Sequence, residues 1–266
     1  MNWSRISAVL CVVAACVVFV APAWGVKYVA LGDSYSSGTG TRMYYDSNCQ
    51  KSVHAYPYLL RNAHPSWAFV HAACSGATTN SLLSSQVSSV TSDTNWVSYT
   101  IGGNDAGFSS VITQCAQPSW SSNCDGAINN AQAFIRNTLP GRLDQVNNAI
   151  KSRAPSAKVI ALDYPRLFNG TDCNAFTWFS SSEMTRLNQT ADLLRDTIRA
   201  AATRAGANFL FRDVIPPFIG HAVCDGGSAS STEWINGLSN PVGESYHPKT
   251  TGHANGYYPV VHNSTG

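Results

Sequence analysis

Short apolar segments alternate with longer helical patterns along the chain. Five apolar runs have the length and β-branched content of buried strands. They cover residues 26–31, 67–72, 96–101, 158–162 and 208–211. Because strands that alternate with helices are typical of a parallel sheet covered on both faces, the pattern predicts an α/β protein. We expect a three-layer α/β/α sandwich around a mostly parallel five-stranded sheet.

Two long helical patterns separate these runs. Residues 127–153 place apolar side chains at three- and four-residue spacing, and Pro140 is expected to divide them into two helices. Residues 181–204 begin with Ser-Ser-Glu, which is typical of a helix N-terminus, and then repeat apolar side chains along one face. A last helix is expected to begin at Pro248, since proline is tolerated in a first turn. The remaining long stretches, 114–125 and 215–241, are expected to be loops.

The first 25 residues have the pattern of a secretory signal peptide. Arg5 precedes an apolar run over residues 6–20, and small residues then permit cleavage after Ala23 or Gly25. The run is short for a membrane span, which argues against an N-terminal anchor. The sequence therefore predicts an exported, extracellular protein in which residues 26–266 form a single domain.

Composition and cysteine usage fit this compartment. Charged residues make up 12% of the chain and the formal net charge is +2, so nothing favours nucleic acid as a partner. Six cysteines follow the signal segment, an even number typical of three disulfides in an exported chain. We expect sequential pairing, which closes the shortest loops: Cys49–Cys74, Cys115–Cys124 and Cys173–Cys224. A zinc site is the alternative, but the chain has no C-x-x-C or H-x-x-x-H spacing.

Three N-glycosylation sequons follow the signal segment, and they matter if the source is eukaryotic. They begin at Asn169, Asn188 and Asn263. Five tryptophans are expected to pack in the core or over disulfides rather than to form a sugar-binding platform. They are Trp67, Trp96, Trp120, Trp178 and Trp234.

Small polar residues follow the first three predicted strands, at the edge where an open parallel sheet binds ligands. Ser34 stands in GDSYSSG, Gly76 in CSGATT and Asn104 in GGND, while His247 stands near the C-terminus in ESYHP. Taken alone, Ser34 would be interpreted as a turn residue and Asn104 as a turn or helix cap. The joint occurrence of the four blocks favours a functional site instead.

These blocks resemble those of the SGNH hydrolases, also called GDSL-type esterases and lipases. Ser34, Gly76, Asn104 and His247 match the four residues that name the family, in order and approximate spacing, over nearly the whole mature chain. The spacing and cysteines are most similar to the secreted actinobacterial and fungal lipase and phospholipase branch. The resemblance implies ester hydrolysis with no metal and no organic cofactor.

The residue roles follow from the chemistry of acyl transfer. Ser34 is a poor nucleophile until a base removes its proton, and His247 is the candidate base. The resemblance implies an oxyanion hole made by the backbone N–H groups of Ser34 and Gly76 and the side-chain amide of Asn104.

The group that orients His247 departs from the family pattern. The family usually has an aspartate three residues before the histidine, and this chain has Glu244 there. Either the Glu244 carboxylate or a backbone carbonyl, that of Ser245, would hold the imidazole in the required tautomer. The sequence leaves both alternatives open.

The sequence thus predicts a secreted serine esterase or lipase that forms an acyl-enzyme at Ser34. The expected substrates are acyl lipids or short-to-medium acyl esters. We expect a monomer that contacts a lipid surface transiently, and the sequence shows no recognisable lid helix. A carbohydrate esterase of the acetylxylan type is the alternative within the enzymes. A catalytically silent binding module on the same fold is the alternative from another class.

Overall fold

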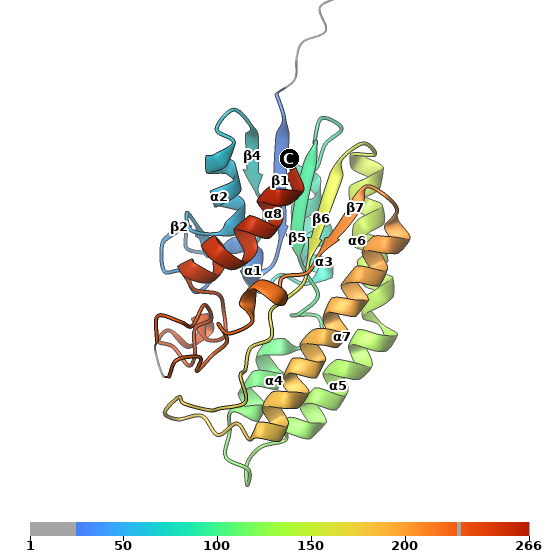
Figure 1. Cartoon of the computed structure of the whole chain (residues 1–266). Coiled ribbons are helices and arrows are strands. Elements are labelled where there is room, and N and C mark those ends of the chain that lie inside the picture. The colour runs from blue at the N-terminus through green and yellow to red at the C-terminus, as the bar shows by residue number, and fades with distance from the viewer. Residues whose placement is uncertain (1–24, 228–229, 266) are drawn as a thin grey trace, which may run out of the picture.

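The computed structural model describes residues 25–227 and 230–265 (Figure 1). The predicted signal peptide lies outside this part of the chain, apart from Gly25. Across the two described ranges, no helix is both long and apolar enough to cross a membrane.

Five parallel strands form the central sheet. They are β1 (Lys27–Gly32), β4 (Ala68–His71), β5 (Trp96–Thr100), β6 (Lys158–Leu162) and β7 (Phe209–Arg212). Their order is β4-β1-β5-β6-β7, and every pairing is parallel. The five predicted strands are therefore all confirmed. A separate antiparallel hairpin joins β2 (Tyr44–Asp46) to β3 (Lys51–Ser52).

Helices cover both faces of the sheet, which explains why the strands are apolar throughout. The helices are α1 (Ser34–Ser37), α2 (Tyr56–Ala63), α3 (Thr79–Ser81), α4 (Phe108–Cys115), α5 (Cys124–Asn137), α6 (Leu139–Arg153), α7 (Ser181–Ala205) and α8 (Tyr258–Thr265). Figure 1 shows α2 and α8 on one face and α6 and α7 on the other. This is the predicted three-layer α/β/α sandwich.

The helix predictions hold except at some boundaries. The 127–153 pattern does divide, because α5 ends at Asn137 and Pro140 lies in the first turn of α6. Helix α5 begins at Cys124 and α4 occupies residues 108–115, so the predicted loop 114–125 shrinks to residues 116–123. Helix α4 was missed because its eight residues are too few to show a clear period.

The prediction that the last helix begins at Pro248 is wrong. Pro248 forms an isolated antiparallel bridge with Ile235, and helical structure begins at residue 250. It continues as a π-helical segment, Gly252–Tyr257, into α8. The bridge holds the chain extended behind His247, and this delays the helix by two residues.

The three disulfides pair sequentially, as expected: Cys49–Cys74, Cys115–Cys124 and Cys173–Cys224. The expectation for the tryptophans is only partly correct. Trp67, Trp96 and Trp234 pack against the core, whereas Trp120 is 84% and Trp178 is 52% exposed. Both exposed tryptophans lie on loops beyond the ends of helices, where no other element covers them.

Candidate active site

The nucleophile turn leaves the central strand β1 at its carboxyl end. Gly32 has φ +121°, and a Cβ there would collide with the carbonyl oxygen of Thr100, so the position requires glycine. The Asp33 side chain caps α1 by accepting from the backbone N–H of Tyr35. Ser34 is the first residue of this short helix, and it is buried. The core of the protein therefore fixes the position of the Ser34 side chain.

The Asp33 carboxylate accepts hydrogen bonds that stabilise this turn, as is typical of aspartate in turns. Its Oδ1 lies 3.0 Å from the Tyr35 nitrogen and 2.9 Å from Thr100 Oγ1, and its Oδ2 accepts from the Tyr164 hydroxyl. Burial raises the pKa of Asp33 to about 6, against the lowering effect of these donors. Asp33 thus connects the turn to the end of β5 and to the segment that follows β6.

His247 lies between Ser34 and a backbone carbonyl. Its Nε2 is 2.8 Å from Ser34 Oγ, and its Nδ1 is 2.9 Å from the carbonyl oxygen of Ser245. Because a carbonyl can only accept, Nδ1 carries the hydrogen and Nε2 is left to accept the Ser34 proton. Burial lowers the pKa of His247 to about 4, so the imidazole is neutral at neutral pH. This arrangement is that of a serine with its general base.

The Glu244 carboxylate is bound by residues other than His247. The buried carboxylate accepts from the Tyr44 hydroxyl at 2.7 Å and from Arg42 Nε at 2.7 Å. Each carboxylate oxygen therefore has a partner on the segment that follows the nucleophile helix. Of the two alternatives that the sequence leaves open, the structure places the Ser245 carbonyl on Nδ1 and uses Glu244 to hold the turn.

Further contacts tie the histidine turn to its surroundings. The Tyr35 hydroxyl donates to the carbonyl of Tyr246 at 2.6 Å, and Tyr246 has φ +61°. The side-chain and backbone nitrogens of Asn236 both donate to the carbonyl of His247, at 3.0 and 2.9 Å. The backbone on both sides of His247 is thus held in place, and this limits how far the imidazole can move.

The two remaining signature residues come from the loops after β4 and β5. Gly76 is exposed with φ +79° and open space where a Cβ would lie, so its backbone conformation requires glycine. Asn104 lines the same pocket as Ser34 and His247, and its Nδ2 donates to the carbonyl of Ala77 at 2.9 Å. That bond uses one of the two amide hydrogens and leaves the other to a substrate oxygen.

Asp105 is a supporting residue that sequence reasoning missed. Its carboxylate accepts from the Thr79 nitrogen at 2.8 Å and from the Thr79 hydroxyl at 2.6 Å. These bonds join the GGND block to helix α3 behind CSGATT, so the loops that carry Asn104 and Gly76 are held together. An acid directly after a candidate oxyanion residue was the available signal.

An apolar pocket adjoins the Ser34–His247 pair. Helices α4, α5 and α7 supply its apolar wall, through Phe108, Val111, Ile112, Ala131, Ile135, Leu187, Ala191 and Leu194. The empty space inside it, including the open mouth, is about 760 Å³. A hydrocarbon-lined space beside a nucleophile suits an apolar substrate group.

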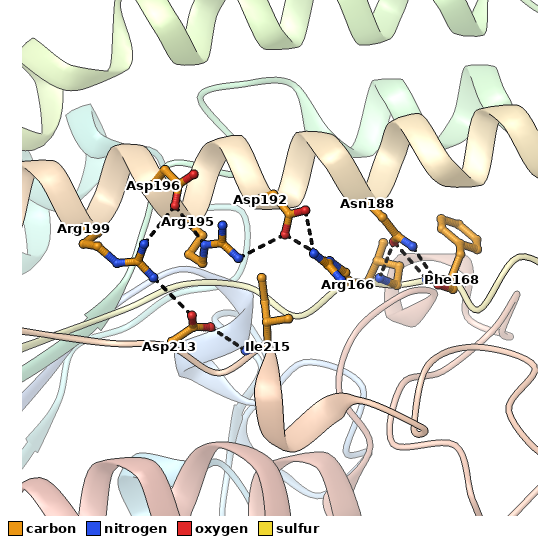
Figure 2. A network of polar contacts seen from close by, with 10 residues as sticks. Arg166, Phe168, Asn188, Asp192, Arg195, Asp196, Arg199, Asp213 and Ile215 are labelled. Atoms are coloured by element: carbon orange, nitrogen blue, oxygen red, sulfur yellow. Dashed lines mark hydrogen bonds and ion pairs between the residues drawn. The ribbon is translucent and has the colours of Figure 1, made fainter.

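Two other predicted groups can be placed. Among the described residues, Cys173, Cys224 and Glu233 converge closely enough to suggest a metal site, but the two cysteines form a disulfide and have no thiolate to offer. Asn188 uses its Nδ2 on the carbonyl of Phe168 at 2.7 Å, as Figure 2 shows, and this argues against its modification in the folded protein.

Comparison with known proteins agrees with this geometry. The sequence matches the GDSL-like Lipase/Acylhydrolase family over residues 30–254. It is 43% identical over 244 residues to Lipase 1 of Streptomyces coelicolor, covering 90% of this chain and 87% of that protein. The extracellular lipase of Streptomyces rimosus, a crystal structure, is 40% identical with a TM-score of 0.82, covering 90% of this chain and 99% of that one.

A second solved structure is equally similar. Phospholipase A1 from Streptomyces albidoflavus NA297 has a TM-score of 0.82 and 39% identity, with 90% of this chain and 99% of that chain covered. The family match and these relatives span most of the chain. The chain is therefore a carboxylic ester hydrolase and belongs to the GDSL-like lipase/acylhydrolase family.

Proposed function

We propose that the mature chain, residues 26–266, is a secreted lipase-type esterase that hydrolyses acyl lipid esters through an acyl-enzyme at Ser34. The 2.8 Å contact between His247 Nε2 and Ser34 Oγ carries this proposal. Three disulfides support an oxidising, extracellular location. The silent binding module is disfavoured because all four signature residues are present and the base already contacts the nucleophile.

In the proposed mechanism Ser34 Oγ attacks the ester carbonyl while His247 Nε2 takes the hydroxyl proton. The Ser245 carbonyl stabilises the imidazolium that forms, without itself taking a proton. The oxyanion is bound by the N–H groups of Ser34 and Gly76 and by the Asn104 amide, and the first N–H groups of a helix have no partner within it.

The tetrahedral intermediate then collapses. The alcohol leaves with the proton from His247, and an ester bond joins the acyl group to Ser34. Water repeats the sequence with His247 as base, which releases the carboxylic acid and restores the Ser34 hydroxyl.

The apolar pocket favours a lipid acyl chain over an acetyl group. An acetyl group has a single methyl carbon to bury, whereas a longer chain gains about 0.8 kcal/mol for each CH₂ that it buries. The names of the most similar relatives, lipases and a phospholipase A1, point the same way. An acetylxylan-type esterase would use the same catalytic residues but has no need of this pocket.

Chain-length profiling tests the proposal. The mature protein, Ser34→Ala and Ala191→Phe are compared on p-nitrophenyl esters from acetate to palmitate. We expect Ser34→Ala to be inactive on every ester, and we expect Ala191→Phe, which fills the pocket, to lose long-chain turnover while it keeps acetate turnover. Preference of the unaltered protein for acetate would contradict the lipid assignment, and activity in Ser34→Ala would contradict the mechanism.

A further inference from the structure

The large exposed hydrophobic side chains of the described residues share one end of the molecule. They are Met43, Tyr45, Trp120, Phe176, Trp178, Ile219, Leu238 and Val242. Each of these residues lies in a segment that follows the carboxyl end of a strand. Each segment ends at a helix that returns to the opposite edge of the sheet, and these helices are α2, α5, α7 and the one that ends in α8. None lies on the turns at the opposite edge, residues 64–67, 90–95, 154–157 and 206–208.

Parallel strands place all of these segments beyond the same edge of the sheet, where Ser34 and His247 also lie. Figure 1 shows the strands running toward the lower end of the view, with the loops of residues 116–123 and 163–180 at that end. Trp120 lies on the first loop, and Phe176 and Trp178 lie on the second. Trp120 and Phe176 are 84% and 81% exposed, so these two rings carry almost no packing within the protein.

These two loops are anchored rather than loose. The disulfide Cys115–Cys124 closes the first loop at its base, and the Trp178 nitrogen donates to the Ala116 carbonyl at 3.2 Å, which joins the second loop to the first. Phe176 has φ +70°, a conformation that is rare for a bulky side chain. Exposing a ring in a strained backbone position stabilises nothing in the free protein, so the observation calls for a function.

The lysines and arginines at this end are already paired with acids. All four lysines and arginines of the segments 33–55, 101–123, 163–180 and 213–249 form ion pairs: Arg42–Glu244, Lys51–Asp46, Arg166–Asp192 and Lys249–Glu233. Figure 2 shows how Asp192 on α7 holds Arg166. The loop acid Asp172 accepts from Thr177 and from the backbone of Phe179. This end therefore offers apolar rings and no free cation to a binding surface.

We propose that Trp120, Phe176 and Trp178 dock this end of the enzyme onto a zwitterionic lipid surface, with the nucleophile facing that surface. The inference rests on the proposed function, because lipid esters reside in such surfaces. Tryptophan and phenylalanine rings insert at the boundary of headgroups and acyl chains, where they bury apolar area. With no free cation at this end, anionic lipid adds little, and salt has little effect on binding.

Sedimentation with phosphatidylcholine vesicles tests the docking surface. Binding is measured in the Ser34→Ala background, which does not degrade the vesicles, for the parent, for Trp120→Ser/Phe176→Ser and for Pro65→Ser. The last replaces an exposed apolar residue on a turn at the opposite edge. We expect the double variant to bind at least about tenfold more weakly and Pro65→Ser to bind like the parent, with no change between low and high salt.

The outcomes separate this inference from the proposed function. Each variant is also prepared with Ser34 intact, and its turnover of soluble p-nitrophenyl butyrate reports the ester chemistry alone. We expect this turnover to stay unchanged. Full vesicle binding by the double variant would overturn the docking surface while leaving an active esterase. Binding only to anionic vesicles, with loss in salt, would overturn it as well.

Discussion

The two side chains proposed to be catalytic are held by different parts of the molecule. Ser34 follows the central strand β1, and Asp33 connects its turn to the buried Thr100 and Tyr164. His247 lies on a turn without a strand or long helix, and side chains from residues 35–44 hold that turn from outside. The core therefore fixes the nucleophile, whereas the base depends on contacts from the nucleophile segment and from Asn236.

The largest expected effect comes from breaking either half of the pair. We expect Ser34→Ala and His247→Ala each to lower kcat by at least about 10⁴-fold, and the double variant to fall no further, since the two residues act as a unit. Initial rates on p-nitrophenyl butyrate measure this. A double variant slower than both single variants by the product of their effects would show that the two residues act independently.

Loss of the oxyanion amide ranks second. We expect Asn104→Ala to lower kcat by about 10²- to 10³-fold with little change in KM, because the amide binds charge that develops only in the transition state. Steady-state kinetics on the same ester separates kcat from KM. A change confined to KM would mean that Asn104 only helps to bind the ground-state substrate.

The hydrogen bond from the Tyr35 hydroxyl to the Tyr246 carbonyl joins the two regions, and deleting one oxygen atom removes it. Tyr35→Phe leaves the Tyr246 carbonyl without its donor, and we expect it to lower the free energy of unfolding by about 1–3 kcal/mol and to reduce kcat. Tyr246→Phe is the matched control, because the buried Tyr246 hydroxyl has no partner among the described residues. Equal losses in the two variants would contradict a specific role for the Tyr35 hydroxyl.

Protonation of His247 has the smallest expected effect on activity at neutral pH. Burial lowers its pKa to about 4, so the neutral base persists well below pH 6.5 and is lost as the pH falls through about 4. The same shift removes folding stability as the pH falls from 6.5 toward 4, because the unfolded chain binds the proton first. The acid limb of kcat/KM should therefore lie near pH 4. A limb near pH 6.5 would show that the pKa of His247 is not lowered by its surroundings.

Much of this was predictable from local pattern, and the rest was not. The strands are visible because both faces of the sheet are covered, which makes each run apolar throughout. Ser34, Gly76, Asn104 and His247 follow strands or stand near the C-terminus in recognisable blocks. The partner of His247 could not be predicted, because it depends on the backbone angles of one turn and on Arg42 and Tyr44, two hundred residues earlier.

Exposed aromatic residues mark a second limit. Composition suggests that a tryptophan is buried, and Trp120 is not, since only the tertiary arrangement reveals that its loop extends beyond α4 and α5. The prediction for Pro248 failed for a similar reason, because its bridge to Ile235 is a tertiary contact that the local pattern does not show.

The central claim is that the Ser245 carbonyl, and not the Glu244 carboxylate, orients the catalytic histidine. The most direct test compares kcat/KM of Glu244→Gln with that of Ser34→Ala on p-nitrophenyl butyrate. The amide of glutamine keeps an oxygen for Arg42 or Tyr44, so we predict that Glu244→Gln stays within about tenfold of the unaltered enzyme. A loss of about 10⁴-fold, the size seen when a triad acid becomes an amide, would show that Glu244 is the orienting acid and would contradict the claim.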